Sequence, residues 1–321
     1  MHRQMLTEAD VRILDVSSVP TSISDIANQT GYSRGYVSER VAHLENFDLV
    51  QTVHRGRTKT IQTVQTAMRE AYHDLTTSQA SIDYPSLISP SMLRVCWFLD
   101  RPTTVSEIEQ RLTLRRRRIY QLLEQLQSRG FISKNGNHYV LTDRQKGLAQ
   151  FAKAVIKYEP RHRIHSHLTR AAIVWTGPHE ALITVEDESL DDVQELDEDQ
   201  QQWHATGLAR FAEYGLEFFT SSPQPYFYSA LRETLQPADF IAHTLILETD
   251  TRNVSYCALL MTELNLSGAE LRTSAGYYGI EETINDLVQF LETRGEADIE
   301  NTSFPDWQEM QSLAKQYEVD L

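Results

Sequence analysis

The feature that most constrains this fold is an internal repeat with a spacing of 82 residues. Residues 20–50, PTSISDIANQTGYSRGYVSERVAHLENFDLV, align without a gap on residues 102–132, PTTVSEIEQRLTLRRRRIYQLLEQLQSRGFI. The matching positions are mostly apolar, for example Ile26 with Ile108 and Val41 with Leu123. Because the polar positions mostly differ, the repeat predicts two modules with similar cores and different surfaces.

Each copy has the pattern of three helices followed by a β-hairpin and a further helix. In the first copy, capping residues and apolar spacing predict helices at 7–17, from Ser22 to Gly31 and from Ser33 onward, strands at 49–53 and 60–64, and a helix within 61–79. In the second copy we expect helices at 92–99, 104–112 and 115–127, strands at 131–133 and 139–141 joined by Asn135-Gly136, and a closing helix at 145–158. This order is that of the winged helix-turn-helix.

The stretches ISDIANQTGYSRGYVSERVAHLENFDLV and VSEIEQRLTLRRRRIYQLLEQLQSRGFI resemble archaeal and bacterial transcriptional regulators of the MarR and ArsR type. The resemblance covers about residues 5–158. It implies two tandem DNA-binding modules, and it does not indicate which genes they control.

Residues 159–321 contain no repeat and form a third predicted region. Strands are expected at 171–176, 181–185, 211–220 and 226–229, and helices at 238–247, 255–264, 281–294 and 306–317. An acidic segment at 186–202 is expected to be a solvated connection. The predicted fold class is therefore mainly α with small β-wings. It comprises winged helix-turn-helix domains at 1–80 and 81–158, followed by an acidic α+β domain at 159–321.

Charge is divided unevenly along the chain. Residues 1–170 contain 24 Lys and Arg against 16 Asp and Glu, a balance of +8, whereas residues 171–321 contain 6 against 29, a balance of −23. A basic half joined to an acidic half indicates an anionic partner for the first and solvation for the second. The high acidity and the scarcity of lysine resemble proteins of extremely halophilic archaea.

The third helix and the wing of the first copy contain candidate DNA contacts. A helix fits the major groove, and Arg, Ser and backbone N–H groups contact phosphates. With Val37, Val41 and Leu44 facing inward, the residues expected to meet DNA are Ser33, Arg34, Gly35, Tyr36, Ser38, Glu39 and Arg40, with Arg55, Arg57 and Lys59 on the wing. Arg40 is expected to contact guanine or phosphate. The alternative is that the module is only a scaffold for protein contacts.

The second copy offers a more basic surface with a weaker wing. Its candidate contacts are Arg115, Arg116, Arg117, Arg118, Tyr120 and Gln121. The four arginines are suited to phosphates or guanines. They also fit a solvated basic face, or ion pairs with the acidic third domain.

Other motifs carry less functional information. His162, His165 and His167 lack the spacing of a zinc site, and we expect a basic linker there. Gly177, Glu186 and Glu188 resemble the glycine and paired acids of nucleotidyltransferases, but Pro178 departs from that pattern. The aromatic segment from Phe211 to Tyr228 is expected to be core, with the lining of an effector pocket as the alternative. Tyr277-Tyr278 is expected to be a turn, and Cys96 and Cys257 to be buried free thiols.

The sequence therefore predicts a cytoplasmic, sequence-specific transcriptional regulator that binds double-stranded DNA. It lacks a predicted transmembrane helix, and we expect neither enzymatic activity nor a cofactor or metal. Apolar stripes within 61–79 and 145–158 predict a homodimer, and a small-molecule effector or a protein partner is expected at the C-terminal domain. The alternative is an antitoxin-like or adaptor protein whose acidic domain binds a protein while the winged helices regulate its own operon.

Overall fold

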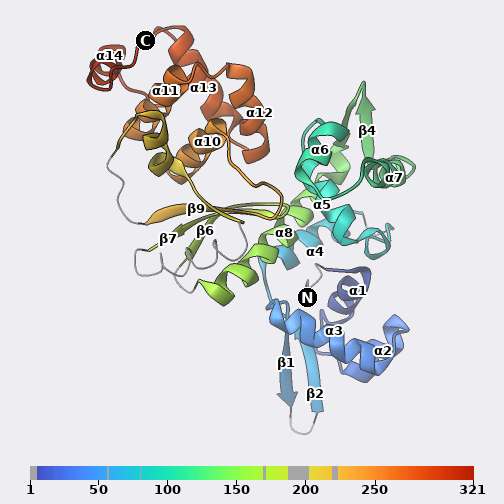
Figure 1. The fold of residues 1–321 in the computed structure, drawn as a ribbon. Coiled ribbons are helices and arrows are strands. Elements are labelled where there is room, and N and C mark those ends of the chain that lie inside the picture. Colours follow the sequence, from blue (N-terminus) through green and yellow to red (C-terminus); the bar gives the residue numbers. More distant parts are fainter. Residues whose placement is uncertain (1–5, 56–57, 80, 169–170, 187–201, 219–222) are drawn as a thin grey trace. The chain divides into compact units, whose positions relative to one another are not determined.

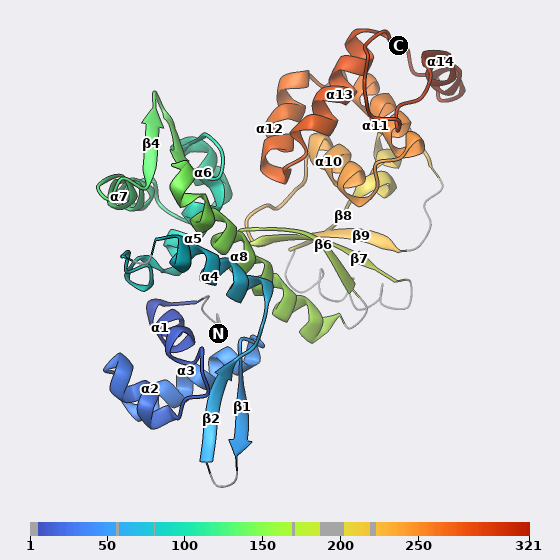
Figure 2. The ribbon, with the colours of Figure 1, turned by 180° about the vertical axis from the view of Figure 1, so that it is seen from behind.

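The computed structural model describes residues 6–55, 58–79, 81–168, 171–186, 202–218 and 223–321. The fold is mainly α-helical, and the described residues contain antiparallel sheets of two, three and four strands (Figure 1, Figure 2). The chain divides into two compact units, Met1–Arg163 and Ile164–Leu321. None of the helices in the described ranges has the length and apolar character needed to cross a membrane.

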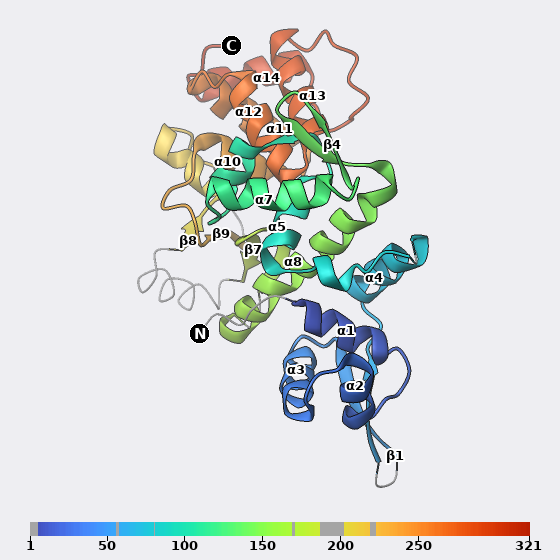
Figure 3. The same ribbon diagram turned by 90° about the vertical axis from the view of Figure 1, so that its right-hand side faces the viewer.

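The first copy of the repeat forms three helices, a two-stranded ribbon and a fourth helix, drawn in blue in Figure 3. These elements are α1 Glu8–Val16, α2 Ile23–Thr30, α3 Arg34–Asn46, β1 Val50–Arg55, β2 Thr58–Thr63 and α4 Ala67–Ser78. The predicted caps are present: the carboxylate of Asp10 accepts the N–H of Thr7 at 2.8 Å, and the hydroxyl of Ser22 accepts the N–H of Asp25. The expected helix within 61–79 begins only at Ala67, because Ile61 pairs with Thr52 in the ribbon.

The second copy repeats this order. It consists of η1 Pro85–Leu87, α5 Pro90–Phe98, β3 Thr103–Thr104, α6 Val105–Arg111, α7 Arg116–Gln127, β4 Ile132–Asn135, β5 His138–Leu141, η2 Asp143–Gln145 and α8 Lys146–His167. Helices α1 and α5 begin and end 82 residues apart, so the repeat extends upstream of Pro20. Register Asn135↔His138 places Gly136 and Asn137 in the hairpin turn, one position later than the expected Asn135-Gly136.

Hydrogen bonds that shape each copy also recur at this spacing. The hydroxyl of Thr21 donates to the carbonyl of Val16 at 3.1 Å, and that of Thr103 donates to the carbonyl of Phe98 at 2.8 Å. Both threonines are buried, and each directly precedes the N-cap residue of the next helix. The repeat therefore includes buried polar contacts as well as the apolar core.

Helices α4 and α8 pack against each other inside the first unit. The rings of Tyr72 and Phe151 have centroids 5.2 Å apart, and a Cβ atom at Gly147 would lie 3.4 Å from Cδ1 of Leu75. The apolar stripes that predicted a homodimer are buried within the single chain, at Met68, Tyr72, Leu75, Leu148, Phe151, Ala152 and Val155. These stripes therefore do not provide the exposed dimer surface that we expected.

Helix α8 is longer than predicted. It continues beyond residue 158 to His167, because Ile164, which is buried, extends its apolar stripe at helical spacing from Ile156. The segment containing His162, His165 and His167 is helical rather than the expected linker, and the side chains of these three residues lie outside the described part.

The second unit combines a four-stranded sheet with a group of helices. The sheet has the order β6 Ala171–Gly177, β7 Glu180–Val185, β9 Gln224–Ser229 and β8 Trp203–Ala205. The helices are η4 Gly207–Tyr214, α10 Pro237–Leu247, α11 Thr251–Glu263, α12 Gly268–Tyr278, α13 Glu281–Glu292 and α14 Trp307–Gln316. Alternate residues of β7 pack with Ile164 on one face of the sheet, and α10 contacts β6 (Figure 1).

Two predictions for this unit were wrong and two elements were missed. Residues 207–214 form a 3-10 helix where a strand was expected at 211–220. Phe211 and Tyr214 of this helix, and Phe218 beyond its end, pack in the helical core. Strand β8 and helix α12 were not predicted, and Tyr277-Tyr278 ends α12 rather than forming a turn. Residues 219–220 and the acidic segment at 187–201 lie outside the described residues.

Candidate nucleic-acid interface

The exposed face of α3 is the first candidate contact surface. Gly31 ends α2 at φ +77°, in the left-handed region, and lets the chain turn into α3. The hydroxyl of Ser33 accepts the N–H of Tyr36 at 3.3 Å and caps the helix. The exposed residues, which we call the α3 surface, are Ser33, Arg34, Gly35, Tyr36, Ser38 and Glu39. Val37, Val41 and Leu44 are buried on the opposite face, as expected.

Arg40 does not belong to this surface. Its Nε donates to Oδ1 of Asp10 at 2.8 Å, and its Nη2 binds Oδ2 of the same carboxylate. The side chain of Asp10 is fully buried, and that of Arg40 is 13% exposed. The expectation that Arg40 contacts a base or phosphate is therefore corrected, because this arginine neutralises a buried carboxylate and joins α3 to α1.

The β1–β2 ribbon contains the residues that were predicted for the wing of the first copy. Arg55 ends β1, and Lys59 lies opposite His54 in the register. Lys59 is exposed, the side chain of Arg55 is outside the described part, and Arg57 lies entirely outside it. The structure therefore places one of the three predicted basic side chains at the surface of the ribbon.

The N-terminal half of α7 is the second candidate surface. Arg115 is the N-cap residue, and Arg116, Arg117 and Arg118 form the first turn. The exposed residues, which we call the α7 surface, are Arg115, Arg116, Arg117, Arg118, Tyr120 and Gln121. The buried face consists of Ile119, Leu122, Leu123 and Leu126.

Local contacts orient part of the α7 surface. Arg116 forms an ion pair with Glu109 at 3.1 Å, and its guanidinium lies 6.0 Å from the ring centroid of Tyr120. Both members of the ion pair are exposed, so the pair contributes little to stability. The ring of Tyr120 is 45% exposed and lies beside the arginines.

The ribbon of the second copy is shorter than that of the first. Strands β4 and β5 form four register pairs, whereas β1 and β2 form six. Lys134 and His138 are exposed, and the ammonium of Lys134 lies 5.2 Å from the ring centroid of Tyr139. The second copy therefore concentrates its positive charge on the helix rather than on the ribbon.

The second unit contains a buried charged network that the sequence did not reveal. Nε of Arg232 donates to Oε1 of Glu180 at 2.7 Å, and its Nη1 lies 2.9 Å from Oδ1 of Asp239. The hydroxyls of Tyr277 and Tyr278 donate to Glu180 and Asp239, respectively. The side chains of Glu180 and Asp239 are 0% and 4% exposed. In the sequence, Arg232 is recognisable only as an isolated basic residue in an acidic region, and this pattern does not predict its partners.

Burial and the neighbouring charges shift the pKa values of two groups in this network, Asp239 and Tyr278. Burial opposes ionisation of Asp239, but the positive charge of Arg232, supported by His243 and the N–H of Gln236, lowers the pKa of this carboxyl to about 2. Burial and then the charge of Asp239 raise the pKa of Tyr278 well above its ordinary value, so the phenol stays protonated. Because its groups satisfy one another, the network joins β7 to α10 and α12 and has the character of a structural element.

Other candidate sites in the second unit are explained by packing. A Cβ atom at Gly177 would lie 2.4 Å from the ring of Trp175 and 2.6 Å from the hydroxyl of Tyr277, so glycine is needed there for space. Glu188 lies outside the described residues. Cys96 and Cys257 are buried and free, and burial raises the pKa of the Cys96 thiol to about 12.

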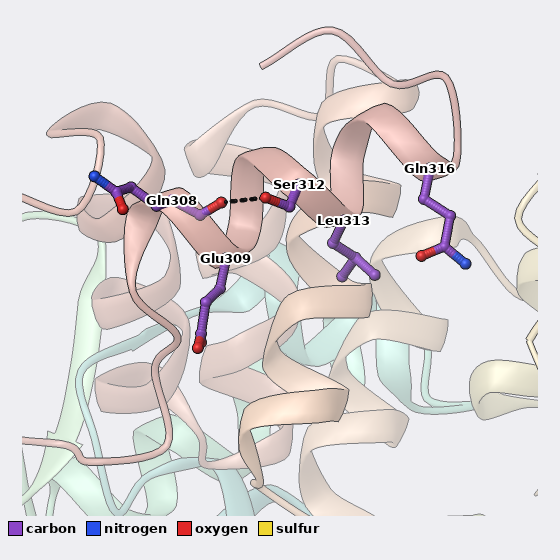
Figure 4. Close-up of a pocket in the computed structure, with 5 residues that line it drawn as sticks. All are labelled: Gln308, Glu309, Ser312, Leu313 and Gln316. Carbon is purple, nitrogen blue, oxygen red and sulfur yellow. Dashed lines mark hydrogen bonds between the residues drawn. The ribbon is translucent and has the colours of Figure 1, made fainter.

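A shallow hollow on α14 offers little chemistry. All five residues that line it belong to this one helix, and Ser312 is already bonded to the carbonyl of Gln308 (Figure 4). Glu309 is the only charged residue among the five. Across the described residues, no group of three or more His, Cys, Asp and Glu side chains is arranged to hold a metal ion.

One comparison with known proteins gave a match. A model of the family described as HVO_2833_C, C-terminal matches residues 200–319. The match lies in the second unit and does not include the α3 and α7 surfaces. No curated protein and no solved structure matches the chain.

Proposed function

We propose that this chain is a cytoplasmic transcriptional regulator that binds double-stranded DNA. Its tandem winged helix-turn-helix modules are residues 1–80 and 81–158, and residues 159–321 form a separate α+β domain. The observation that supports this proposal is the equivalent exposure of the α3 and α7 surfaces. The first turns of these two helices lie 82 residues apart, and each projects polar side chains opposite a buried apolar face.

The chemistry of the two surfaces suits different parts of a DNA duplex. The α3 surface combines Arg34 and Glu39 with hydroxyl groups, and this mixture can donate to and accept from base edges in the major groove. The α7 surface has four adjacent arginines and no acidic residue, which suits the phosphate backbone. We assign sequence recognition to α3 and most of the electrostatic affinity to α7.

A mobility-shift assay tests the proposal on a duplex from the region upstream of the protein's own gene. We expect Arg117→Ala to weaken binding to all sequences and to reduce the slope of log K against log salt by about one unit. Arg129→Ala removes the same charge from an exposed residue just beyond the C-terminal end of α7 and serves as the control. Equal binding by the wild type and both variants at every salt concentration would refute the assignment of α7.

A further inference from the structure

A buried interface inside one chain joins the two copies of the repeat. Besides the contact between Tyr72 and Phe151, polar side chains at the ends of α4 and α8 are linked. Nε2 of Gln145 donates to Oε1 of Gln79 at 2.8 Å, and Nε2 of Gln79 donates to the carbonyl of Arg144, also at 2.8 Å. Gln145 is 4% exposed, so this polar contact is buried and specific.

The segment that connects the copies is also anchored to both of them. Asp83 forms an ion pair with Arg12 of the first copy at 3.1 Å. The hydroxyl of Tyr84 donates to Oε1 of Gln145 at 3.0 Å, and its ring lies 6.2 Å from that of Phe131 in the second copy. Tyr84 is fully buried. Tyr84 therefore anchors the connection in the core of the second copy, and Asp83 ties it to the first copy at the surface.

These contacts occupy the apolar faces of α4 and α8, the stripes from which the sequence predicted that two chains would pair. A regulator with one module per chain needs a second chain to present two recognition helices, and it then contacts two equivalent half-sites. Here the post-wing helices of the two copies pair within one chain. The two helices that result are chemically different, because the α7 surface has four arginines where the α3 surface has the sequence Ser33-Arg-Gly-Tyr36.

We infer that a single chain binds one duplex through α3 and α7 together, at a site with two unlike halves. This inference rests on the proposed function and specifies its partner: a duplex without two-fold sequence symmetry. The half that contacts α3 carries the sequence information. The half that contacts α7 is held mainly through its phosphates and tolerates base changes.

Site-directed DNA cleavage tests both contacts in the full-length chain. Ala42 and Glu124 are exposed, lie 82 residues apart on α3 and α7, and follow the proposed contact residues. Ala42→Cys and Glu124→Cys each provide one cysteine for a tethered iron chelate, because Cys96 and Cys257 are buried. Asn46→Cys and Ser128→Cys are a second matched and exposed pair, to be used if a label in the first pair weakens binding.

We expect one chain per duplex by sedimentation velocity, with the two labels cutting separate segments of the same upstream duplex. Base changes in the segment cut from α3 should reduce affinity at least tenfold, whereas changes in the other segment should reduce it less than threefold, since each good base contact contributes about 1–3 kcal/mol. Two chains per duplex, or cutting from only one helix, would overturn the inference. Failure of the unlabelled chain to bind any duplex would instead overturn the proposed function and, with it, this inference.

Discussion

The pair formed by Asp10 and Arg40 shows how one position can change its chemistry between two copies of a module. At a spacing of 82 residues, Asp10 corresponds to Met92 and Arg40 to Leu122. Asp10, Met92 and Leu122 are all buried, and Arg40 is largely so. Equivalent places are thus occupied by an ion pair in one copy and by two apolar side chains in the other. Because both positions differ together, the alignment contained the signal that Arg40 faces inward.

Removal of Arg40 alone should destabilise the first copy. Arg40→Leu leaves the carboxylate of Asp10 buried without its cation, which we expect to cost about 3–5 kcal/mol. The double variant Asp10→Met/Arg40→Leu reproduces the residues of the second copy and should recover most of this loss. Hydrogen-exchange mass spectrometry on peptides from α1 and α3 measures the effect locally. Equal protection in the single variant and the wild type would show that the ion pair is dispensable.

The carboxylate of Asp239 should make the second unit sensitive to acid. Its pKa in the folded chain is lowered to about 2, below the value of about 3.9 for an unfolded aspartate. The ionised form therefore contributes stability above about pH 4, and this contribution, about 2–3 kcal/mol, is lost as the pH falls through the folded pKa of about 2.

Asp239→Asn separates this contribution from general acid unfolding. The variant should be less stable at neutral pH, and its stability should change less between pH 4 and pH 2, as followed by hydrogen exchange in α10 peptides. If the stability of the variant changed with pH as steeply as that of the wild type, another group would have to titrate in this range. Glu270 serves as a comparison site. Its pKa is also lowered, by hydrogen bonds from the hydroxyl and N–H of Ser267, but its carboxylate lies in an exposed helix cap rather than in the buried network.

At the scale of elements, the helices of the first unit could be predicted because local chemistry marks their ends. Ser33 caps α3, and Thr104 with Glu107 caps α6, each before an apolar stripe. The same logic failed at residues 211–220, where aromatic residues are frequent in both strands and cores. The network around Arg232 could not be predicted, because the hydrogen-bonded pair Glu180 and Tyr277 alone is separated by 97 positions in the sequence and meets only through tertiary packing.

The close approach of α4 and α8 at Gly147 permits a test of their coupling to DNA binding. Gly147→Leu adds a side chain against Leu75, and overpacking of this kind costs about 1–3 kcal/mol. We expect the variant to bind the upstream duplex more weakly, although Gly147 is in neither contact surface. Gly147→Ala is the control, because its Cβ fits at 3.4 Å. Fluorescence anisotropy measures both affinities, and wild-type affinity in Gly147→Leu would argue against coupling.

At the scale of the whole molecule, the uneven charge should modulate non-specific DNA affinity. Residues 171–321 carry a balance of −23 and repel phosphates, whereas residues 1–170 carry +8. A chain ending at Arg163, the last residue of the first unit, should therefore bind a random-sequence duplex several-fold more tightly than the full chain at low salt. The difference should shrink above about 0.5 M salt, where screening shortens electrostatic interactions to a few ångströms.

Titration of the random-sequence duplex with each of the two chains, at a range of salt concentrations, measures the two affinities and checks this expectation. Circular dichroism first establishes that residues 1–163 retain their helices. Equal affinities at low salt would show that the acidic half does not act on DNA binding.

The pairing of α4 with α8 inside one chain also has a consequence for how the protein can evolve. In a protein that pairs with an identical copy, every mutation enters both halves of the assembly at once, so both half-sites on the DNA must adapt together. Here a mutation in α3 leaves α7 unchanged. If the chain binds DNA as we propose, each of the two surfaces and the half-site that it contacts can therefore diverge separately while the other surface stays bound.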